Sequence, residues 1–404
     1  MSDRAATRSD AIESGGWRLP LAGAVALLLG IGLGRYAFTP LITPLVEQQW
    51  FSDAQTARLG AINLLGYLCG AASAHRIGRR FGERRTIAVC LIAVVASLFA
   101  CALDWGMVWY APWRLMAGWA ASTLTIVVTP AIMARMPARA RPGASAVIFT
   151  GIGVGTIASS LIVPWLADAS IAAAWCAVGV VGGLLAAWSW FAVWRTLPDL
   201  PARETGTAHA VSGVAVPWLA ITLIVVAYGL SSAGYVPHSL YWVDYIAREL
   251  GRGLGSGSAY WLLLGVGGVV GPAAAGITAA RLGFRPALVA SFVLMTLATA
   301  LPLVSTQPWA LTLSSFFVGA MVPAIITLTA GVVVDLVPMG RQQQIWGWAT
   351  LSFAATQAIG GFAMARLYEQ IGRYIDLIGM GAAILVIGCA CAMAGAVAAA
   401  RAER

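Results

Sequence analysis

The chain has 404 residues, of which 60% are hydrophobic and only 10% are charged, and its formal net charge is +9. Soluble domains carry about a quarter charged residues, so this composition excludes a protein that faces water on all sides. The chain has 25 basic residues, and all of them are arginines. The absence of lysine excludes a P-loop ATPase and Schiff-base chemistry, because both need a lysine amine.

Apolar stretches of about 18 residues or more recur along the chain, each long enough to cross a ~30 Å hydrocarbon core. We expect each of them to be a helix, because lipid cannot satisfy an open backbone. The pattern predicts twelve spans, at residues 19–46, 55–74, 86–103, 107–134, 143–166, 172–194, 217–236, 258–280, 286–304, 309–337, 344–367 and 375–400.

Polar segments divide the spans into two groups of six. Segment 1–18 lacks the pattern of a signal peptide, and we expect a cytoplasmic tail there. Segment 195–216 contains Pro198 and Pro201 and predicts a cytoplasmic linker. The predicted domains are therefore an N-terminal six-helix bundle at 19–194 and a C-terminal one at 217–400, followed by a cytoplasmic tail at 401–404.

An internal repeat relates the two groups. A shift of 201 residues places the segment 80–84 on the segment 281–285, each of which follows the second span of its half, and it places Gly118 on Gly319. The repeat predicts an all-α integral membrane fold of twelve helices, built as two bundles related by a pseudo-twofold axis. Two parallel repeats of this kind are a known transporter plan, with the substrate site between them near the middle of the membrane.

The placement of the arginines predicts the orientation. With the N-terminus in the cytoplasm, eighteen arginines lie in cytoplasmic loops or tails and five lie outside. This bias follows the positive-inside rule and predicts a multi-pass protein of the cell inner membrane with both termini in the cytoplasm. Because the arginines are dispersed among loops, we expect contact with lipid headgroups and no nucleic-acid partner.

Three short motifs resemble the major facilitator superfamily of transporters. The segment His75-Arg76-Ile77-Gly78-Arg79-Arg80 resembles its D-R-x-G-R-R loop signature, except that His75 replaces the acidic residue. The segment Arg114-Leu115-Met116-Ala117-Gly118 resembles its R-x-x-x-G element, and the segment 32–40 is similar to the first-helix pattern of the YbfB-like branch. The resemblance implies secondary transport by alternating access. It also implies that Arg76, Gly78, Arg79 and Arg80 form a loop that takes part in the conformational change. In the family the acidic residue of this loop helps to hold the cytoplasmic helix ends together, and His75 at that position puts this role in doubt.

Two arginines lie inside predicted spans. Arg35 lies sixteen residues into its span, roughly 24 Å along a helix, which is too deep for its charge to reach water easily. A charge at that depth should face a cavity or a partner. It could bind or gate an anion, or it could be a structural pair with backbone carbonyls or an unseen acid. Arg114 could reach the outer interface, but the family element favours an inward face and a role in coupling or substrate contact.

Other residues are candidates by type and position. We expect Tyr36, Tyr228, Tyr235 and Trp346 to line the pathway with the two arginines, and Gly34, Pro40, Gly118, Gly151 and Gly155 to allow close packing or hinge motion. No acid lies clearly at mid-membrane, and Asp244 and Glu369 fall in outer loops or at helix ends. The six cysteines read as packing thiols, and neither a metal site nor a catalytic residue is expected.

These observations predict a secondary active transporter that moves a small molecule, with an organic anion favoured because guanidinium groups match carboxylates and phosphates. Two rival classes are a membrane enzyme that acts on lipid and a membrane sensor that does not transport. The enzyme would need a cluster of Asp, Glu and His at one interface, and the sensor would usually carry a soluble output domain. We expect no enzyme activity, no cofactor and a monomeric protein. Its partners are a small-molecule substrate, membrane lipids and a coupling ion, with the proton as one candidate.

Overall fold

The computed structural model describes residues 16–137, 140–197 and 216–402, and within them all regular structure is helical. The elements in chain order are α2 (Arg18–Leu27), the π-helix η1 (Leu28–Leu33), α3 (Phe38–Glu47), α4 (Asp53–Phe81), α5 (Glu83–Ala100), α6 (Gly106–Met133), α7 (Arg141–Ala167), α8 (Ile171–Ala192), the short 3₁₀ turn η3 (Trp194–Thr196), α9 (Trp218–Leu240), α10 (Trp242–Asp244), the π-helix η4 (Tyr245–Glu249), α11 (Gly253–Leu282), α12 (Phe284–Val304), α13 (Pro308–Leu336), α14 (Met339–Ile371) and α15 (Tyr374–Ala402).

Nine helical segments in the described ranges are long and apolar enough to cross a membrane, which makes this a multi-pass membrane protein. They are Arg18–Glu47, Gly106–Met133, Gly143–Ala167, Ile171–Thr196, Trp218–Leu240, Gly253–Leu282, Phe284–Val304, Pro308–Leu336 and Tyr374–Ala402. The other three predicted spans coincide with α4, α5 and α14. Charge explains part of this difference, because the 18-residue helix α5 begins with Glu83-Arg84-Arg85.

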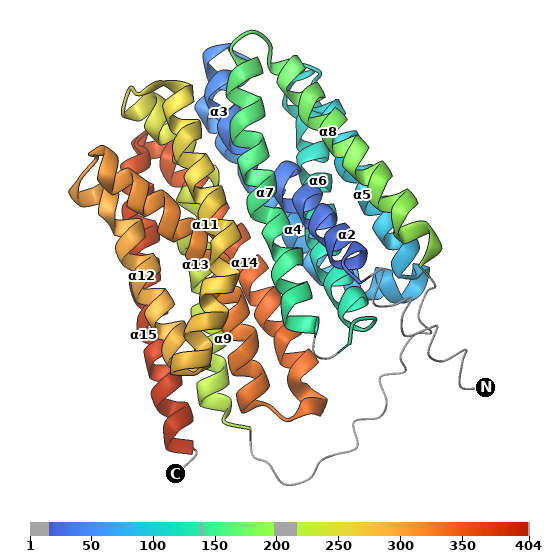
Figure 1. Ribbon diagram of the computed structural model, residues 1–404. Helices are drawn as coiled ribbons and strands as arrows, with labels where there is room; N and C mark the ends of the chain where they lie inside the picture. The colour runs from blue at the N-terminus through green and yellow to red at the C-terminus, as the bar shows by residue number, and fades with distance from the viewer. Residues whose placement is uncertain (1–15, 138–139, 198–215, 403–404) are drawn as a thin grey trace.

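The helices form two groups, one of α2–α8 and one of α9–α15, which lie side by side in Figure 1. We call these groups the N-half and the C-half. Helix α7 packs against α11, and α4 packs against α14, so these two pairs join the halves. The end of the helices that holds Arg18 and Ala402 is called the terminal end, and the end that holds Glu47 and Glu249 is called the distal end.

The two halves repeat the same close helix approach at one offset. A Cβ added at Gly66 would lie 2.0 Å from the carbonyl oxygen of Leu115, and one at Gly267 would lie 2.1 Å from that of Phe316. Both members of the first pair are 201 residues from their counterparts. Only glycine lets these backbones touch, so α4 against α6 and α11 against α13 are packed in the same way.

The loop after each half's second span also repeats its backbone. Gly82 follows α4 and Gly283 follows α11, and both have φ of +84°. This left-handed region carries little strain for glycine and is strained for other residues. The sequence match between segments 80–84 and 281–285 therefore corresponds to one shared turn.

Helix α9 runs through Pro237 to Leu240, where the sequence pattern ended the span at Val236. A proline removes its own amide donor but leaves its carbonyl free to accept, and the amide of Tyr241 donates to the Pro237 oxygen at 2.9 Å. With α10 and η4 the chain stays helical to Glu249. Asp244 and Arg248 thus lie on helical turns at the distal end.

Candidate functional site

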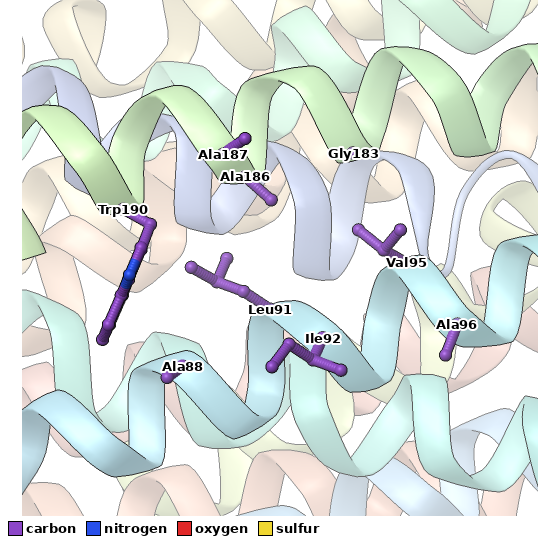
Figure 2. Close-up of a pocket in the computed structure, with 9 residues that line it drawn as sticks. All are labelled: Ala88, Leu91, Ile92, Val95, Ala96, Gly183, Ala186, Ala187 and Trp190. Atoms are coloured by element: carbon purple, nitrogen blue, oxygen red, sulfur yellow. The ribbon is translucent and has the colours of Figure 1, made fainter. Parts of the chain in front are cut away.

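A groove of about 530 Å³ lies between α5 and α8 (Figure 2). Leu91, Ile92 and Val95 line one side of it and Ala186 and Trp190 line the other, and no lining residue carries a charge. Ile92 is 69% exposed, and it lies on α5, which coincides with a predicted membrane span. An exposed apolar side chain on such a helix faces lipid. The groove therefore suits an acyl chain of the bilayer better than a polar substrate.

Arg35 lies between the halves and is 3% exposed. Its Nη1 donates to Oε1 of Gln357 on α14 at 3.0 Å. Its Nε and Nη2 have no hydrogen-bond partner in the described part of the chain. A buried cation without a carboxylate is costly, so this guanidinium has two donors ready for an anion.

Aromatic rings surround the Arg35 guanidinium. The ring of Tyr36 lies 5.2 Å from its central carbon, and the ring of Tyr67 on α4 lies 5.5 Å away. Tyr36 packs edge-on against Trp261 of α11, at 5.5 Å between ring centroids, and against Tyr235 of α9, at 6.5 Å. With Gln357 of α14, the site is thus built by five segments from both halves, the first span, α4, α9, α11 and α14. We call these four aromatic residues the ring wall.

The first span is irregular where it carries Arg35. It changes from α-helix to the π-helix Leu28–Leu33, and a turn follows before α3 begins at Phe38. The amide of Phe38 donates to the carbonyl of Arg35 at 3.4 Å, and that of Thr39 donates to Tyr36 at 3.2 Å. Pro40 stands in the first turn of α3, where its missing amide donor costs least. The irregular stretch therefore precedes Pro40, and it frees the carbonyl of Gly34.

Arg114 of α6 donates to the freed carbonyl of Gly34 and also to the carbonyl of Arg35. It is 1% exposed, and its Nη1 donates to the oxygen of Gly34 at 2.9 Å while its Nη2 donates to that of Arg35 at 3.4 Å. Its guanidinium also lies 4.3 Å from the ring of Phe38. Arg114 thus supports the backbone that carries Arg35, and Nε is its one nitrogen with no hydrogen bond in the described residues.

The other predicted pathway residues form a separate group in the C-half. Tyr228 of α9 packs against Trp346 of α14, at 5.9 Å between ring centroids, and against Phe353 at 4.9 Å. Tyr235 belongs to the ring wall instead. The structure therefore brings together Arg35, Tyr36 and Tyr235. Tyr228 and Trp346 form a second contact between α9 and α14, the helices that also carry Tyr235 and Gln357.

The predicted loop motif lies away from Arg35, at the terminal end of α4. Arg76, Arg79 and Arg80 are exposed there and Gly78 is partly exposed. Nearby, Glu83 at the start of α5 pairs with Arg135 at 3.0 Å within the N-half.

The predicted packing glycines contact neighbouring backbones. A Cβ at Gly118 would lie 2.0 Å from the carbonyl oxygen of Asn63, and one at Gly151 would lie 2.0 Å from that of Ala24. One at Gly155 would lie 2.7 Å from the Cα of Gly32, and one at Gly34 would meet the carbonyl of Gly30 in its own span. Gly151 and Gly155 therefore hold α7 against the first span.

Polar contacts also join the halves at the distal end. The hydroxyl of Thr39 donates to the carbonyl of Ser239 at 2.6 Å, and that of Thr43 donates to Asp244 at 2.8 Å. Arg248 donates to Asp244 of its own half and to Asp53 of the N-half. We call the Thr43–Asp244 and Asp53–Arg248 contacts the distal ties.

Arg248 is a permanent cation in these ties. Burial lowers the pKa of its guanidinium, but hydrogen bonds and charge from Asp244, together with the hydrogen bond to Asp53, outweigh burial and raise the pKa above its ordinary value. Asp244 is 0% exposed, and its carboxylate also accepts from the hydroxyl of Tyr374. Its charge is therefore fully partnered.

Sequence analysis missed several of these residues. Asp244 was expected in an outer loop or at a helix end, and it does end α10, but its burial and its contact with Thr43 of the other half were not predicted. The signal was present, because Asp244 and Arg248 have the i, i+4 spacing of a helical ion pair. Gln357, Tyr67 and Trp261 gave no comparable signal, since their contacts to the first span cross long sequence distances.

Comparisons with known proteins agree with this architecture. The family model described as "Uncharacterised MFS-type transporter YbfB" matches residues 27–393. A search of curated proteins found no match. The matched range includes both halves, Arg35, Arg114 and the distal ties. The chain therefore belongs to the YbfB-type family of major facilitator superfamily transporters.

Proposed function

We propose that this protein is a secondary active transporter that moves a small organic anion across the cell inner membrane by alternating access. The observation that carries the proposal is Arg35, a buried cation between the halves with two unpaired donors and no acid partner in the described residues. Membership of a transporter family supports the class of function, and the chemistry of the guanidinium supports the class of substrate.

The proposed architecture is twelve helices in two six-helix bundles, 19–194 and 217–400, joined by a linker at 195–216. The contacts that repeat at an offset of 201 residues support it, since each half builds the same glycine-mediated crossing. Contacts between equivalent positions support it further. Tyr36 meets Tyr235, Thr39 meets Ser239 and Thr43 meets Asp244, at offsets of 199 to 201 residues. At the offset of 201 residues Asp244 is the counterpart of Thr43, while Ser239 and Tyr235 lie one and two residues from the counterparts of Thr39 and Tyr36. Contacts between counterparts occur beside a twofold axis.

Alternating access needs one end closed while the other is open. The distal ties close the distal end, where the Cβ position of Gly60 in α4 also lies 3.2 Å from the side chain of Leu240 in α9. The hydrogen bond from Thr39 to Ser239 and the ion pair of Arg58 with Glu369 also join the halves at the distal end. We infer a state that opens toward the terminal end.

The arginine distribution places the terminal end in the cytoplasm, so the state opens inward. Cysteines introduced at Arg79 and Asp168 test this orientation. Position 79 follows the second span and position 168 follows α7, so the two should lie on opposite sides of the membrane. A membrane-impermeant maleimide added to intact cells should label position 168 alone. Labelling of position 79 alone would reverse the orientation.

Within this proposal Arg35 contacts the substrate and Arg114 is a positioning residue. Arg114 spends both terminal nitrogens on carbonyls of the first span, which leaves it little capacity for a ligand. It acts by fixing the turn from which Arg35 projects. The proton or another ion would drive transport, and no enzyme activity is proposed.

Uptake into liposomes tests the function. Purified protein is reconstituted, and uptake of labelled organic anions is measured under a proton gradient and without one. Arg35→Gln should abolish uptake, whereas Arg366→Gln should not, because Arg366 is 73% exposed and pairs only with Glu369 of its own helix in the described residues. Both variants lose one positive charge. Equal uptake by both variants would refute a role for Arg35.

A further inference from the structure

The donors that Arg35 leaves free have a definite geometry. Gln357 occupies Nη1, so the unpaired donors are Nε and Nη2. These two nitrogens share one edge of the planar guanidinium, and their N–H bonds run parallel. A carboxylate offers two oxygens at the matching separation and can accept both bonds at once. The Nε and Nη2 edge of Arg35, called its open edge because neither nitrogen has a hydrogen bond in the described residues, therefore has the donor pair that one carboxylate requires.

The surroundings provide no second receptor of this kind. Arg114 has both terminal nitrogens on carbonyl oxygens, its guanidinium lies 4.3 Å from the ring of Phe38, and Nε is its one nitrogen with no hydrogen bond in the described residues. These bonds hold the end of the Arg114 guanidinium on the backbone of the first span, so we assign Arg114 to that backbone and not to a second anionic group of the ligand. The ion pairs of the described residues lie elsewhere, and no carboxylate pairs with Arg35. An ammonium group on the ligand would thus find a cation as its neighbour instead of an anion.

The ring wall indicates what the rest of the ligand is. Tyr36 and Tyr67 lie 5.2 Å and 5.5 Å from the guanidinium carbon, and Tyr235 and Trp261 extend the wall behind Tyr36. All four residues are buried. Aromatic walls of this kind favour apolar or aromatic groups, since burying a further charge against them is costly.

We propose that the substrate is a monocarboxylate whose remaining part is uncharged and apolar, bound through its carboxylate by the Nε and Nη2 edge of Arg35 and packed against the ring wall. This inference rests on the anion site of the proposed function and narrows it. It excludes dicarboxylates, inorganic phosphate and amino acids as preferred ligands.

Ligand binding to purified full-length protein in detergent tests the inference, with the thermal midpoint or the tryptophan fluorescence as the signal. The probes are acetate, isovalerate and benzoate, compared with benzamide, phthalate, phenylalanine and inorganic phosphate. We expect binding of isovalerate or benzoate, and binding at least about tenfold weaker for benzamide, because it lacks the charge that strengthens hydrogen bonds. Phthalate and phenylalanine should also bind at least about tenfold more weakly than benzoate.

Two variants test the edge itself. Arg35→Lys keeps the charge but loses the paired donors, so affinity for the bound monocarboxylate should fall about tenfold or more. Gln357→Glu places a carboxylate beside Nη1 and neutralises the guanidinium from within the protein. We expect it to remove monocarboxylate binding without lowering the thermal midpoint of the ligand-free protein, because it partners a buried charge. This second variant keeps the test valid if Arg35→Lys folds poorly. Arg366→Gln is the matched control and should bind like the wild type.

The outcomes separate the two proposals. If phthalate or phosphate binds more tightly than every monocarboxylate, and Arg35→Lys abolishes that binding, the anion site stands and the monocarboxylate inference is wrong. If Arg35→Lys retains wild-type affinity for benzoate, bidentate binding at the open edge is refuted. If no anion of the panel binds to the wild type, both the inference and the anion site fall, and transport of uncharged compounds would have to be tested instead.

Discussion

The distal ties make a quantitative prediction about the balance between conformations. The double variant Thr43→Val with Asp53→Asn removes both contacts from the N-half. It leaves Asp244 with Arg248 and Tyr374, so no buried charge loses all its partners. The C-half should therefore stay intact while its connection to the N-half weakens.

The size of the effect follows from exposure. The Thr43–Asp244 bond is buried and involves a charged acceptor, which gives about 1.5–3 kcal/mol. Asp53 is 43% exposed, so its pair with Arg248 contributes only about 0.2–1 kcal/mol. Because Asp244 keeps other partners, we take the lower part of the combined range, about 2–3 kcal/mol. That free energy would shift the population toward a distal-open state by about 30- to 150-fold.

Accessibility of a buried distal position measures the shift. Leu240 is 2% exposed and packs against Gly60 across the halves. Leu240→Cys is introduced after the six native cysteines are replaced, and its labelling by a membrane-impermeant maleimide is followed over time. The labelling rate should rise with the distal-open population. Arg366→Ala removes an exposed ion pair within one helix and should leave the rate unchanged.

One result would refute the reasoning. If the double variant folds, as judged by its elution and thermal midpoint, and labels at the wild-type rate, then the distal ties do not hold the halves together. A rise in labelling caused equally by Arg366→Ala would also contradict the assignment, because that change touches neither tie.

Three further predictions follow from local structure. Gly118→Ala should lower the free energy of unfolding by about 1–3 kcal/mol, because its Cβ would lie 2.0 Å from a carbonyl oxygen. Gly276→Ala should leave the free energy of unfolding unchanged, since its Cβ would meet no atom within 4 Å, and chemical denaturation of both variants measures the difference. Arg114→Leu should weaken anion binding at Arg35, because it removes the hydrogen bonds to the carbonyls of Gly34 and Arg35. Arg114→Lys should bind the anion more tightly than Arg114→Leu but less tightly than the wild type. Unaltered affinity in a folded Arg114→Leu protein would be contrary evidence. Arg248 has a raised pKa, so its contribution is fully present below its unfolded pKa and is lost only as pH rises through the higher folded value. The difference in thermal midpoint between wild type and Arg248→Gln should therefore be the same at pH 7 and at pH 10, and a smaller difference at pH 10 would count against this.

Much of the fold could be predicted from sequence, because membrane spans are set by local hydropathy. The predicted first span, 19–46, coincides with α2 to α3, and Arg35 stood out as a charge too deep to be exposed. The repeat was visible through glycines, since their backbone contacts fix the residue type. Three of the predicted spans, which coincide with α4, α5 and α14, are more polar than the nine membrane-spanning segments given above. Of these, α4 and α14 carry polar residues such as Asn63 and Gln357 where they face other helices.

The partners of the site could not be predicted in the same way. The bond from Arg35 to Gln357 joins residues 322 positions apart, and no local pattern marks it. The π-helix before Gly34 depends on Arg114 taking the carbonyls that the irregular turn releases. Likewise, the burial of Asp244 could not be predicted, because the span was expected to end at Val236, whereas tertiary packing continues the helical path beyond Pro237.

The contacts between counterpart positions have a consequence for how such a chain can evolve. In a dimer of identical subunits, a position on the twofold axis meets its own copy, so it can only pair like with like. Joining two copies into one polypeptide removes that restriction. The hydroxyl of Thr43 can then face a carboxylate at Asp244, a pairing that no symmetric dimer could hold on its axis. Covalent fusion thus allows the C-half to carry a charged residue at this position while the N-half carries the hydroxyl that donates a hydrogen bond to it.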